Sequence, residues 1–340
     1  MKAAVYRGVE DITVEDRPIP ELKDGQVLLR VIETGICGTD MQIYLGKHPR
    51  ARTSLVPGHE IFGKVESVGN TVTNVKPGDR VVVYPLISCG VCDPCKTGDA
   101  HVCERLGLDG IDRDGGFAEF VAVDAEQIVP VPDGISDTEA VIVEPLAVVV
   151  HAIYDSAFRV GDTALVTGAG PMGNLLAQVL RAAGARYVAV SEVSPFRRQL
   201  LERLGFETLD PTKTSPADVL KHSTGKPAAD IVFEATGHAS AYPNAVNCCR
   251  VRGHIGFVGI PKTPPVVDIQ AILYKEIHTS SARVYRHRDY VRALAMLASK
   301  SINASSLITD RVPLTSAAHA YELMKKADTS GKIVISPANS

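Results

Sequence analysis

The chain has 340 residues, enough for about two domains of roughly 150 residues each. Hydrophobic residues make up 45% of it and charged residues 22%, as in globular proteins, and 36 basic against 39 acidic side chains give a net charge of −3, which argues against an electrostatic nucleic-acid binder. No apolar targeting segment opens the chain, and Glu144, Pro145 and His151 interrupt its longest apolar stretch, so we expect a cytoplasmic protein with no membrane span.

The N-terminal part of the chain, up to about position 135, predicts an all-β unit. Met1–Arg7 is typical of a short strand, and further β-branched runs follow, separated by turn residues such as Lys76-Pro77-Gly78-Asp79. These runs are 26–32, 63–68, 80–84 and 117–123. We expect them to form a partly open barrel.

Four closely spaced cysteines predict a metal site. They are Cys89, Cys92, Cys95 and Cys103. This spacing lets one loop surround a tetrahedral zinc ion, and the loop also contains Gly90, Pro94 and Gly98, so a buried core segment is a poor alternative. Four thiolates leave no open position on zinc, so the predicted role is structural. Seven cysteines, four of them in the segment 89–103, do not indicate a disulfide framework.

From about residue 161 the pattern changes to strands alternating with helices. Predicted strands are 163–167, 187–191, 230–234 and 254–258, and predicted helices are 172–183, 195–204 and 242–249. Such alternation predicts βαβ units and a parallel sheet covered on both faces. Two further helices, 290–299 and 316–326, and a strand, 332–335, have no domain assignment from the pattern alone.

A glycine-rich turn joins the first of these strands to its helix. The turn contains Gly168, Gly170, Pro171, Met172 and Gly173. Its glycines permit a tight turn and the close approach of a pyrophosphate to the helix N-terminus, where free N–H groups favour anions. An ordinary glycine-rich turn is the alternative.

Glu192 follows the second strand. It stands at the separation from Gly173, roughly 20 residues, at which a carboxylate accepts hydrogen bonds from an adenosine ribose. It would repel a 2′-phosphate, which favours NAD over NADP. The nearby Arg197 and Arg198 weaken that preference, although Arg197 is also suited to stack on adenine.

A third group of residues is scattered along the sequence. It comprises Cys37, His59, Glu60 and Glu144. Each alone has an ordinary structural interpretation, since single cysteines and histidines are often core residues. Together a thiol, an imidazole and two carboxylates can supply three protein ligands to a catalytic zinc ion and leave a fourth position for water or substrate.

The motifs together resemble the zinc-dependent medium-chain dehydrogenase/reductase superfamily, in its branch of sorbitol (polyol) and threonine 3-dehydrogenases. They occur in family order as Cys37-Gly38-Thr39-Asp40, Gly58-His59-Glu60, the four-cysteine loop, Asp114-Gly115-Gly116-Phe117-Ala118-Glu119, Glu144-Pro145-Leu146-Ala147 and Gly168-Ala169-Gly170-Pro171-Met172-Gly173. The resemblance implies an α/β plus β fold. It consists of a Rossmann domain with a doubly wound parallel sheet over 151–286 and a GroES-like β-barrel catalytic domain over 1–150 and 287–340.

The resemblance also implies roles. Cys37 and His59 match the ligands of the catalytic zinc, and Glu60 and Glu144 match acidic positions that bind it directly or through water. Thr39 matches the residue that removes the substrate proton, Asp40 is expected to hydrogen-bond His59, and Val258, Gly259 and Ile260 are expected to border the nicotinamide.

One departure concerns proton transfer. Several relatives have histidine three positions after the equivalent of Thr39, where this chain has Gln42, and a neutral amide cannot take up the proton. His48 or the ribose hydroxyls are the alternatives, against an ordinary exposed loop role for His48.

For the substrate, the segment 281–288 carries Arg283 and Tyr285 where relatives direct side chains into the cleft. Its arginines, Arg283, Arg286 and Arg288, either clamp a carboxylate or phosphate or form a solvated face.

We therefore expect an enzyme with two zinc ions per chain, one catalytic and one structural, that uses NAD in preference to NADP. Its substrate would be a secondary alcohol of a polyol, sugar or sugar acid. L-Threonine 3-dehydrogenase and a non-catalytic cofactor-binding protein that retains the fold are the alternatives. The resemblance further implies a homodimer or homotetramer.

Overall fold

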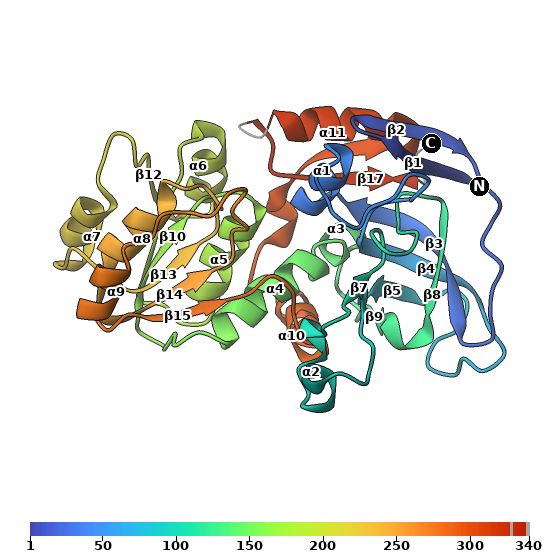
Figure 1. Ribbon diagram of the computed structural model, residues 1–340, viewed down its shortest axis with the longest axis horizontal. Helices are drawn as coiled ribbons and strands as arrows, with labels where there is room; N and C mark the ends of the chain where they lie inside the picture. The colour runs from blue at the N-terminus through green and yellow to red at the C-terminus, as the bar shows by residue number, and fades with distance from the viewer. Residues whose placement is uncertain (327–328, 338–340) are drawn as a thin grey trace. The chain divides into compact units, whose positions relative to one another are not determined.

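The computed structural model describes residues 1–326 and 329–337 and divides them into two compact units (Figure 1). The first unit contains Met1–Glu144, Arg286–Ala298 and the described residues from Ile308 onward, and the second contains Pro145–Tyr285 and Ser299–Leu307. The short segment 299–307, expected in the catalytic domain, therefore belongs to the second unit. Its Asn303 N–H donates to the side-chain oxygen of Gln178 at 2.7 Å, which ties it to a helix of that unit.

The first unit is built around a seven-stranded sheet. Its strands lie in the order β16 (Ile308–Pro313), β17 (Lys332–Ser336), β3 (Gln26–Gly35), β4 (Glu60–Val68), β5 (Arg80–Val83) and β9 (Ile128–Pro130), and β8 (Phe120–Asp124) also pairs with β3. Pairing is antiparallel except between β16 and β17. Hence a strand from the end of the sequence lies next to β3 in this sheet.

Alternation along β3 explains its burial. Val27, Leu29 and Val31 point to one face and join a core of β-branched residues from β4, β5 and β8. A second core packs Tyr321, Phe117 and Ile43 between the first strands and the last helix of this unit. Two antiparallel pairs complete the strands, β1 (Lys2–Gly8) with β2 (Asp11–Asp16) and β6 (Leu86–Ile87) with β7 (Gly107–Leu108).

The first unit also contains α1 (Gly38–Tyr44), α2 (Asp93–Lys96), α3 (Asp137–Ala140), α10 (His287–Ala298) and α11 (Ala317–Lys325). Of these helices, α1 and α2 stand beside the predicted metal sites, and both are short. Helix α4 (Val143–Tyr154) starts at the boundary of the units. It is formed by the longest apolar stretch of the sequence. Among residues 1–326 and 329–337, no helix combines the length and apolar character needed to cross a bilayer.

The second unit contains a six-stranded parallel sheet in the order of a dinucleotide-binding fold. The strands lie as β12 (Glu207–Leu209), β11 (Tyr187–Ser191), β10 (Thr163–Thr167), β13 (Ala229–Glu234), β14 (Cys249–Phe257) and β15 (His278–Ser281). The chain moves outward from β10 to β12 and then returns to the other side of β10. This reversal places the topological switch point between β10 and β13, where ligands bind at the carboxyl ends of such strands.

Amphipathic helices connect these strands. They are α5 (Pro171–Ala182), α6 (Pro195–Glu202), α7 (Pro216–Thr224), α8 (Ala241–Cys248) and α9 (Ile269–Tyr274). Proline at the first helical position starts α5, α6 and α7, because its fixed φ suits the helix and its missing N–H costs no hydrogen bond there. The apolar face of α5, including Leu175, Leu176 and Leu180, is fully buried. The Rossmann-type sheet predicted from sequence is confirmed.

Candidate functional site

The first unit brings Cys37, His59 and Glu60 together. One potential ligand atom from each lies within 4.8 Å of the other two. Cys37 is the N-cap of α1, whereas His59 and Glu60 stand at the beginning of β4, which pairs with the end of β3 through Gly35 and Glu60. The antiparallel pairing therefore aligns two segments that are separated in the sequence. Glu144 lies outside this group of three.

A buried carboxylate connects the two segments. Asp40, which is completely buried, accepts hydrogen bonds from the backbone N–H of Cys37 at 2.8 Å and of Gly58 at 3.2 Å. The expected hydrogen bond from His59 to Asp40 is absent, because His59 Nδ1 and Asp40 Oδ1 lie 3.9 Å apart. Asp40 thus holds the backbone beside both candidate ligands and acts on His59 through its charge.

Negative charges surround His59 in this group. Burial alone would lower the pKa of His59, but the negative charges of Asp40, Cys37 and Glu144 raise that pKa well above its ordinary value. His59 Nδ1 is buried and has no hydrogen-bond partner among the residues that the structure describes. A thiol, an imidazole and a carboxylate in one negative field fit a zinc ion, for which these are the ordinary ligands.

Lys332 faces Glu60 from β17. The two side chains form an ion pair, and the ammonium also donates to the carbonyl oxygen of Ile36 at 3.0 Å. Burial would lower the pKa of Lys332, but the charges of Glu60, Cys37 and Glu144 and the hydrogen bond to Glu60 together raise that pKa above its ordinary value. Sequence reasoning missed this lysine, because no local pattern marks a residue 272 positions from its partner.

Close packing fixes the loop that precedes His59. Gly58 has φ +95°, and a side chain there would meet Phe117 and Thr34 at less than 3 Å. Its carbonyl oxygen accepts from Gly116 N–H at 2.8 Å, and a Cβ on Gly115 would come within 2.1 Å of that oxygen. The glycines of the motif 114–119 therefore let its backbone support the His59 loop.

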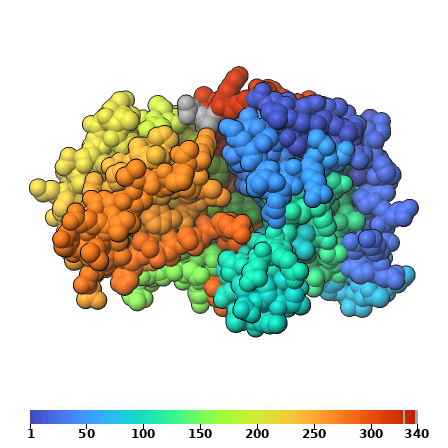
Figure 2. Space-filling view, in the orientation of Figure 1, coloured from blue at the N-terminus to red at the C-terminus, as the bar shows by residue number. Residues whose placement is uncertain are grey.

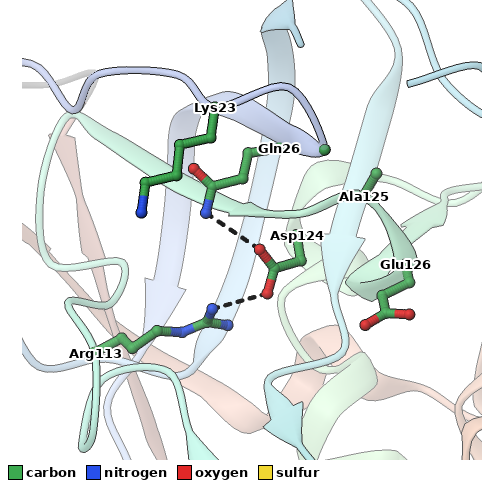
Figure 3. A pocket seen from close by; sticks show the side chains of 7 residues that line it. Lys23, Gln26, Arg113, Asp124, Ala125 and Glu126 are labelled. Atoms are coloured by element: carbon green, nitrogen blue, oxygen red, sulfur yellow. Dashed lines mark hydrogen bonds and ion pairs between the residues drawn. The ribbon is translucent and has the colours of Figure 1, made fainter. Parts of the chain in front are cut away.

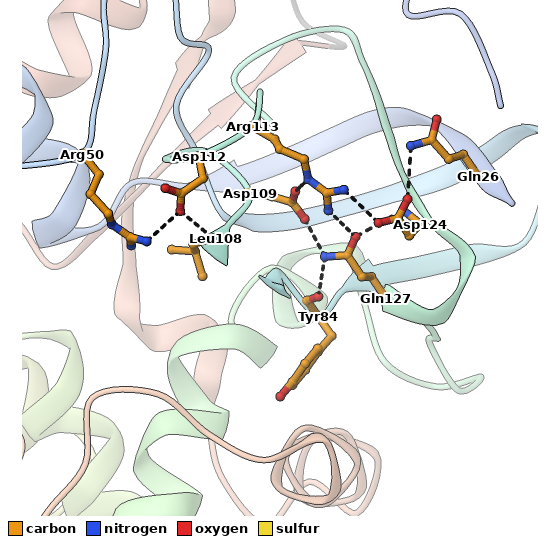
Figure 4. A network of polar contacts seen from close by, with 9 residues as sticks. All are labelled: Gln26, Arg50, Tyr84, Leu108, Asp109, Asp112, Arg113, Asp124 and Gln127. Carbon is orange, nitrogen blue, oxygen red and sulfur yellow. Dashed lines mark hydrogen bonds and ion pairs between the residues drawn. The ribbon is translucent and has the colours of Figure 1, made fainter. Parts of the chain in front are cut away.

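A polar network anchors the loop that carries these glycines (Figure 4). Arg113 reaches three side chains, Asp109 at 2.9 Å, Asp124 at 2.8 Å and Gln127 at 2.8 Å. Gln127 in turn donates to the buried Asp109 at 2.7 Å and to the carbonyl of Tyr84 at 3.1 Å. The network joins the 107–116 segment to Asp124 at the end of β8, to Gln127 in the short turn of 3-10 helix that follows it, and to Tyr84 directly after β5.

We expect Asp40→Ala to weaken metal retention and turnover together. Without its carboxylate, the N–H groups of Cys37 and Gly58 lose their acceptor, and the loss of such supporting groups costs about 10–100-fold in metal affinity. Zinc release to a chelator, followed with a zinc-sensitive dye, measures this. Asp16→Asn, a change at an exposed carboxylate, is the matched control, and equal zinc release from both variants would contradict the role given to Asp40.

The four-cysteine loop forms the second group. The sulfurs of Cys89, Cys92, Cys95 and Cys103 all lie within 4.8 Å of one another. Cys103 Sγ accepts from the backbone N–H groups of Cys89 and Arg105, each at 3.3 Å. All seven cysteines of the chain are free thiols. Figure 2 shows this segment, in teal, at the surface.

Charges around this loop suit a thiolate cluster. Hydrogen bonds from the backbone N–H groups of Val91 and Cys92 lower the pKa of Cys89 to about 5. Conversely, burial and the side chain of Cys92 raise the pKa of Cys95 to about 11. Four clustered thiols resist losing all their protons without a compensating cation, and Zn²⁺ is such a cation.

In the second unit, the glycine-rich turn lies between β10 and α5. Gly168 has φ +93° and its N–H donates to Ser191 at the end of β11, at 2.7 Å. Gly170 is the N-cap of α5 and supplies no side-chain cap, so the N–H groups of the first turn keep no side-chain acceptor from it. A Cβ on Gly173 would lie 1.9 Å from the carbonyl oxygen of Gly168. The turn therefore leaves a backbone cradle at the N-terminus of α5, with Pro171 and Met172 beside it, and the binding of a pyrophosphate there stays a prediction.

Glu192 is buried beside this turn. Its carboxylate accepts from the N–H of Ala169 at 2.7 Å and from that of Ser194 at 2.8 Å. Arg198 donates to the carbonyl oxygens of Glu192 and Val193, whereas the guanidinium of Arg197 lies near Gly170. Of the two arginines, Arg197 is thus the one placed at the glycine turn.

The residues expected beside the nicotinamide follow β14. The N–H groups of Val258 and Gly259 both donate to the carbonyl oxygen of Glu234 at the end of β13. A Cβ on Gly259 would approach Gly237 N at 2.2 Å, so the two loops touch. Val258 is buried and Ile260 is 71% exposed. These residues line the carboxyl edge of the sheet on the far side of the switch point from β11.

Gly173→Ala tests the cradle. Because the added methyl group would lie 1.9 Å from Gly168 O, the turn must open, and we expect the KM for NAD to rise at least about tenfold with the fold retained. Steady-state kinetics and circular dichroism check both points. Gly25→Ala, where a Cβ meets nothing within 4 Å, is the control, and an unchanged KM in Gly173→Ala would refute the assignment.

The residues of the predicted substrate segment 281–288 differ in their exposure and in their contacts. Tyr285 is completely buried, and Arg283 is exposed. Arg286 makes a two-bond ion pair with Asp99 of the four-cysteine loop, at 2.9 and 3.2 Å. Arg286 therefore supports the cysteine loop, which leaves Arg283 and Arg288 as the exposed arginines of the segment.

An open hollow at the surface of the first unit lies apart from these groups (Figure 3). It is open, and its lining residues are Lys23, Gly25, Gln26, Arg113, Asp124, Ala125 and Glu126. Asp124 is already occupied by Gln26 and Arg113. None of the predicted site residues lines it.

Comparison with known families agrees with this geometry. Residues 23–133 match the alcohol dehydrogenase GroES-like domain, and residues 171–299 match the zinc-binding dehydrogenase domain. The chain belongs to the zinc-type medium-chain dehydrogenase/reductase family. The resemblance and fold class inferred from sequence are thereby confirmed.

Family members of known name are similar over nearly the whole chain. The 2-dehydro-3-deoxy-L-galactonate 5-dehydrogenase of Pseudoalteromonas atlantica is 35% identical, with 95% of each chain covered. An L-threonine 3-dehydrogenase of Rhizobium etli is 33% identical over 98% of each chain. Among solved structures, an Escherichia coli short chain alcohol dehydrogenase complexed with NADH has a TM-score of 0.92 and 29% identity, with 99% of each chain covered.

Proposed function

We propose that the chain is a zinc- and NAD-dependent dehydrogenase that interconverts a secondary alcohol of a polyol, sugar or sugar acid with the ketone. The observation that carries this proposal is the assembly of Cys37, His59 and Glu60 into one donor set, in a chain whose second unit has a dinucleotide-binding sheet. A retained fold without catalysis would not require this donor set.

A zinc ion held by Cys37 and His59, with Glu60 or Glu144 as the acidic partner, would polarise the hydroxyl of the substrate. Thr39 has its hydroxyl oxygen 3.9 Å from Cys37 Sγ, which supports a role for it in removing the hydroxyl proton. A bound nicotinamide would supply the hydride acceptor: it would take the hydride, with its two electrons, from the alcohol carbon, while Thr39 would pass on the hydroxyl proton, so that the ketone remains.

The proton path beyond Thr39 has two candidate ends. Gln42 cannot take up a proton, but its backbone carbonyl oxygen accepts from the N–H of His48 at 3.1 Å, in the loop after α1. Burial lowers the pKa of His48, which favours the neutral imidazole, the form that has a ring nitrogen able to accept a proton. The ribose hydroxyls of NAD are the other end.

We infer NAD over NADP from Glu192. Its buried carboxylate directly follows β11, which supports a role in binding the adenosine ribose, and it would repel a 2′-phosphate. Arg197, beside Gly170, is then suited to the pyrophosphate or the adenine. Val258, Gly259 and Ile260 complete this surface on the nicotinamide side.

The similarity of this chain to the 2-dehydro-3-deoxy-L-galactonate 5-dehydrogenase of Pseudoalteromonas atlantica supports an anionic, sugar-derived substrate. In this proposal the exposed Arg283 binds the substrate carboxylate, whereas the buried Tyr285 supports the position of that segment. L-Threonine is the second candidate, because an L-threonine 3-dehydrogenase matches over the same length.

NADH formation by the zinc-loaded protein across polyols, aldonic acids, sugar phosphates and L-threonine, with NADP in parallel, tests the proposal. Turnover of sugar acids that Arg283→Gln weakens through KM supports the substrate assignment. Turnover of neutral polyols alone removes Arg283 from it, turnover of L-threonine alone selects the second candidate, and no turnover on any class refutes the proposal.

We further propose two zinc ions per chain in a reducing, cytoplasmic compartment. The four-cysteine loop supplies the closed structural site and the Cys37 group the open catalytic one. Seven free thiols, four of them clustered, suit a compartment in which disulfides do not form.

We propose that two copies of the chain form a homodimer, alone or within a tetramer, through the outer edge of the six-stranded sheet. Strand β15 is an outer strand, and the preceding α9 exposes Ile269, Leu273 and Tyr274, which are 68%, 72% and 76% accessible. A second copy related by a two-fold axis would pair its own β15 and cover these side chains. Sedimentation of the wild type and of Leu273→Glu measures the state, and a wild-type monomer would refute it.

A further inference from the structure

The ion pair of Lys332 and Glu60 is buried, with the two residues 3% and 1% exposed. Both carboxylate oxygens of Glu60 lie in contact with the ammonium. The third partner of Lys332 is the carbonyl oxygen of Ile36, at 3.0 Å, one residue before Cys37. Lys332 thus contacts Glu60 and the residue adjacent to Cys37.

The backbone around this pair leaves room for it. A Cβ on Gly35 would lie 1.9 Å from Glu60 Oε2 and 2.8 Å from Lys332 Cε, so only glycine at this position lets the two side chains meet. Strand β17 also pairs with β3 through Val334 and Gly35, and Ile36 N–H donates to Ile333 O at 3.0 Å. Three strands therefore fix the position of the ammonium.

A buried lysine needs a permanent partner, because an isolated charge costs several kcal/mol in the interior. Glu60 is that partner, yet it also belongs to the donor set with Cys37 and His59. If the Glu60 carboxylate bound a metal ion, its attraction to the Lys332 ammonium would be weaker, because the metal ion would neutralise part of its negative charge. The metal ion and Lys332 therefore draw on the same carboxylate.

We propose that Lys332 is a positioning residue that competes with the bound metal ion for the Glu60 carboxylate, and so keeps a metal position open to substrate. This inference rests on the proposed zinc site at Cys37 and His59. In its absence Glu60 would bind the ion permanently, which would tighten metal binding and hinder the exchange of substrate. The lysine thus lowers metal affinity in return for an open coordination position.

The experiment measures metal binding rather than turnover alone. Wild type, Lys332→Met, Glu60→Gln and the double variant are stripped of metal, and Zn²⁺ affinity is measured by competition with a chelating dye. We expect Lys332→Met to bind the Zn²⁺ at the Cys37 group on the order of 10–100-fold more tightly, with a lower kcat. In the Glu60→Gln background the same change has little effect, because no carboxylate remains to be released.

Cobalt reports the coordination directly. The visible absorption of Co²⁺ bound at the Cys37 group is expected to shift in Lys332→Met toward a fully protein-coordinated ion and to respond less to added substrate. Lys325→Met is the matched control, since that lysine forms exposed ion pairs with Glu10 and Glu322 and lies outside the site. It should leave both Zn²⁺ affinity and the cobalt spectrum unchanged.

An unchanged or weaker Zn²⁺ affinity in Lys332→Met, or an equal effect with and without Glu60, would overturn the inference and leave the zinc site itself intact. By contrast, a wild-type protein that binds no metal at Cys37 would overturn the proposed function. If Lys332→Met does not fold, Gly35→Ala replaces it, because it keeps both charges but separates the pair. Wild-type affinity and spectrum in Gly35→Ala would then refute the role of the pair.

Discussion

Cys37→Ser is expected to reduce kcat/KM at least about 1,000-fold, equivalent to about 4 kcal/mol of transition-state stabilisation. The hydroxyl of serine is a far poorer zinc ligand than a thiolate, and Cys37 is the only thiol in its group. The loss should therefore remove the proposed catalytic metal and its effect on the substrate hydroxyl. Metal analysis of the purified variant should show one zinc ion fewer per chain, with NADH binding unchanged.

Cys248→Ala is the control for Cys37→Ser. Cys248 is also a buried free thiol, 3% exposed, but it lies on α8 of the second unit and outside both cysteine groups. Its removal should leave zinc content and turnover near those of the wild type. Wild-type turnover in Cys37→Ser would contradict the assignment of Cys37 as a catalytic ligand.

Cys103→Ser is expected to lower the melting temperature by about 10 °C, because losing the four-thiolate site removes on the order of 3 kcal/mol. Helix α2 buries none of its residues, so little apolar packing holds the loop without the metal. Without the metal, the loop would no longer hold Asp99 in a fixed position for its ion pair with Arg286. Calorimetry, with zinc content measured in parallel, records the effect.

Val91→Ala, a truncation of a 58% exposed side chain in the same loop, is the control and should keep both zinc ions and the melting temperature. A Cys103→Ser protein with the wild-type melting temperature would show that the loop is held by other contacts. The catalytic constants separate the two cysteine groups, since the Cys103 change acts first on stability and the Cys37 change first on turnover.

Sequence patterns predicted the strands of the second unit closely, because alternating buried strands and amphipathic helices leave a strong local signal. The strands 163–167 and 187–191 are found with those bounds. The first unit was harder, since short strands such as β6 and β9 have too few residues for a period, and β17 pairs with β3 from the opposite end of the sequence.

For the candidate site, local motifs identified residues that the fold brings together, and they missed Lys332, which contacts Glu60 from a distant part of the chain. The four cysteines and the glycine turn are recognisable by spacing, whereas Lys332 lies in an ordinary strand and gains its role only from Glu60. Asp40 was expected to bond His59, but it binds backbone N–H groups instead, a choice that depends on the loop conformation at Gly58.

The position of β17 has a consequence for synthesis on the ribosome. The second unit has nearly all of its residues once position 285 has been translated, so it can fold while the nascent chain is still attached. The first unit must wait, because β3 lacks its neighbour β17, and Glu60 lacks its ammonium, until Lys332 has emerged. Until then the Glu60 carboxylate has no partner from β17, although β3 already has β4 and β8 beside it. Premature release of the chain would therefore yield a protein with a complete second unit and an incomplete first unit.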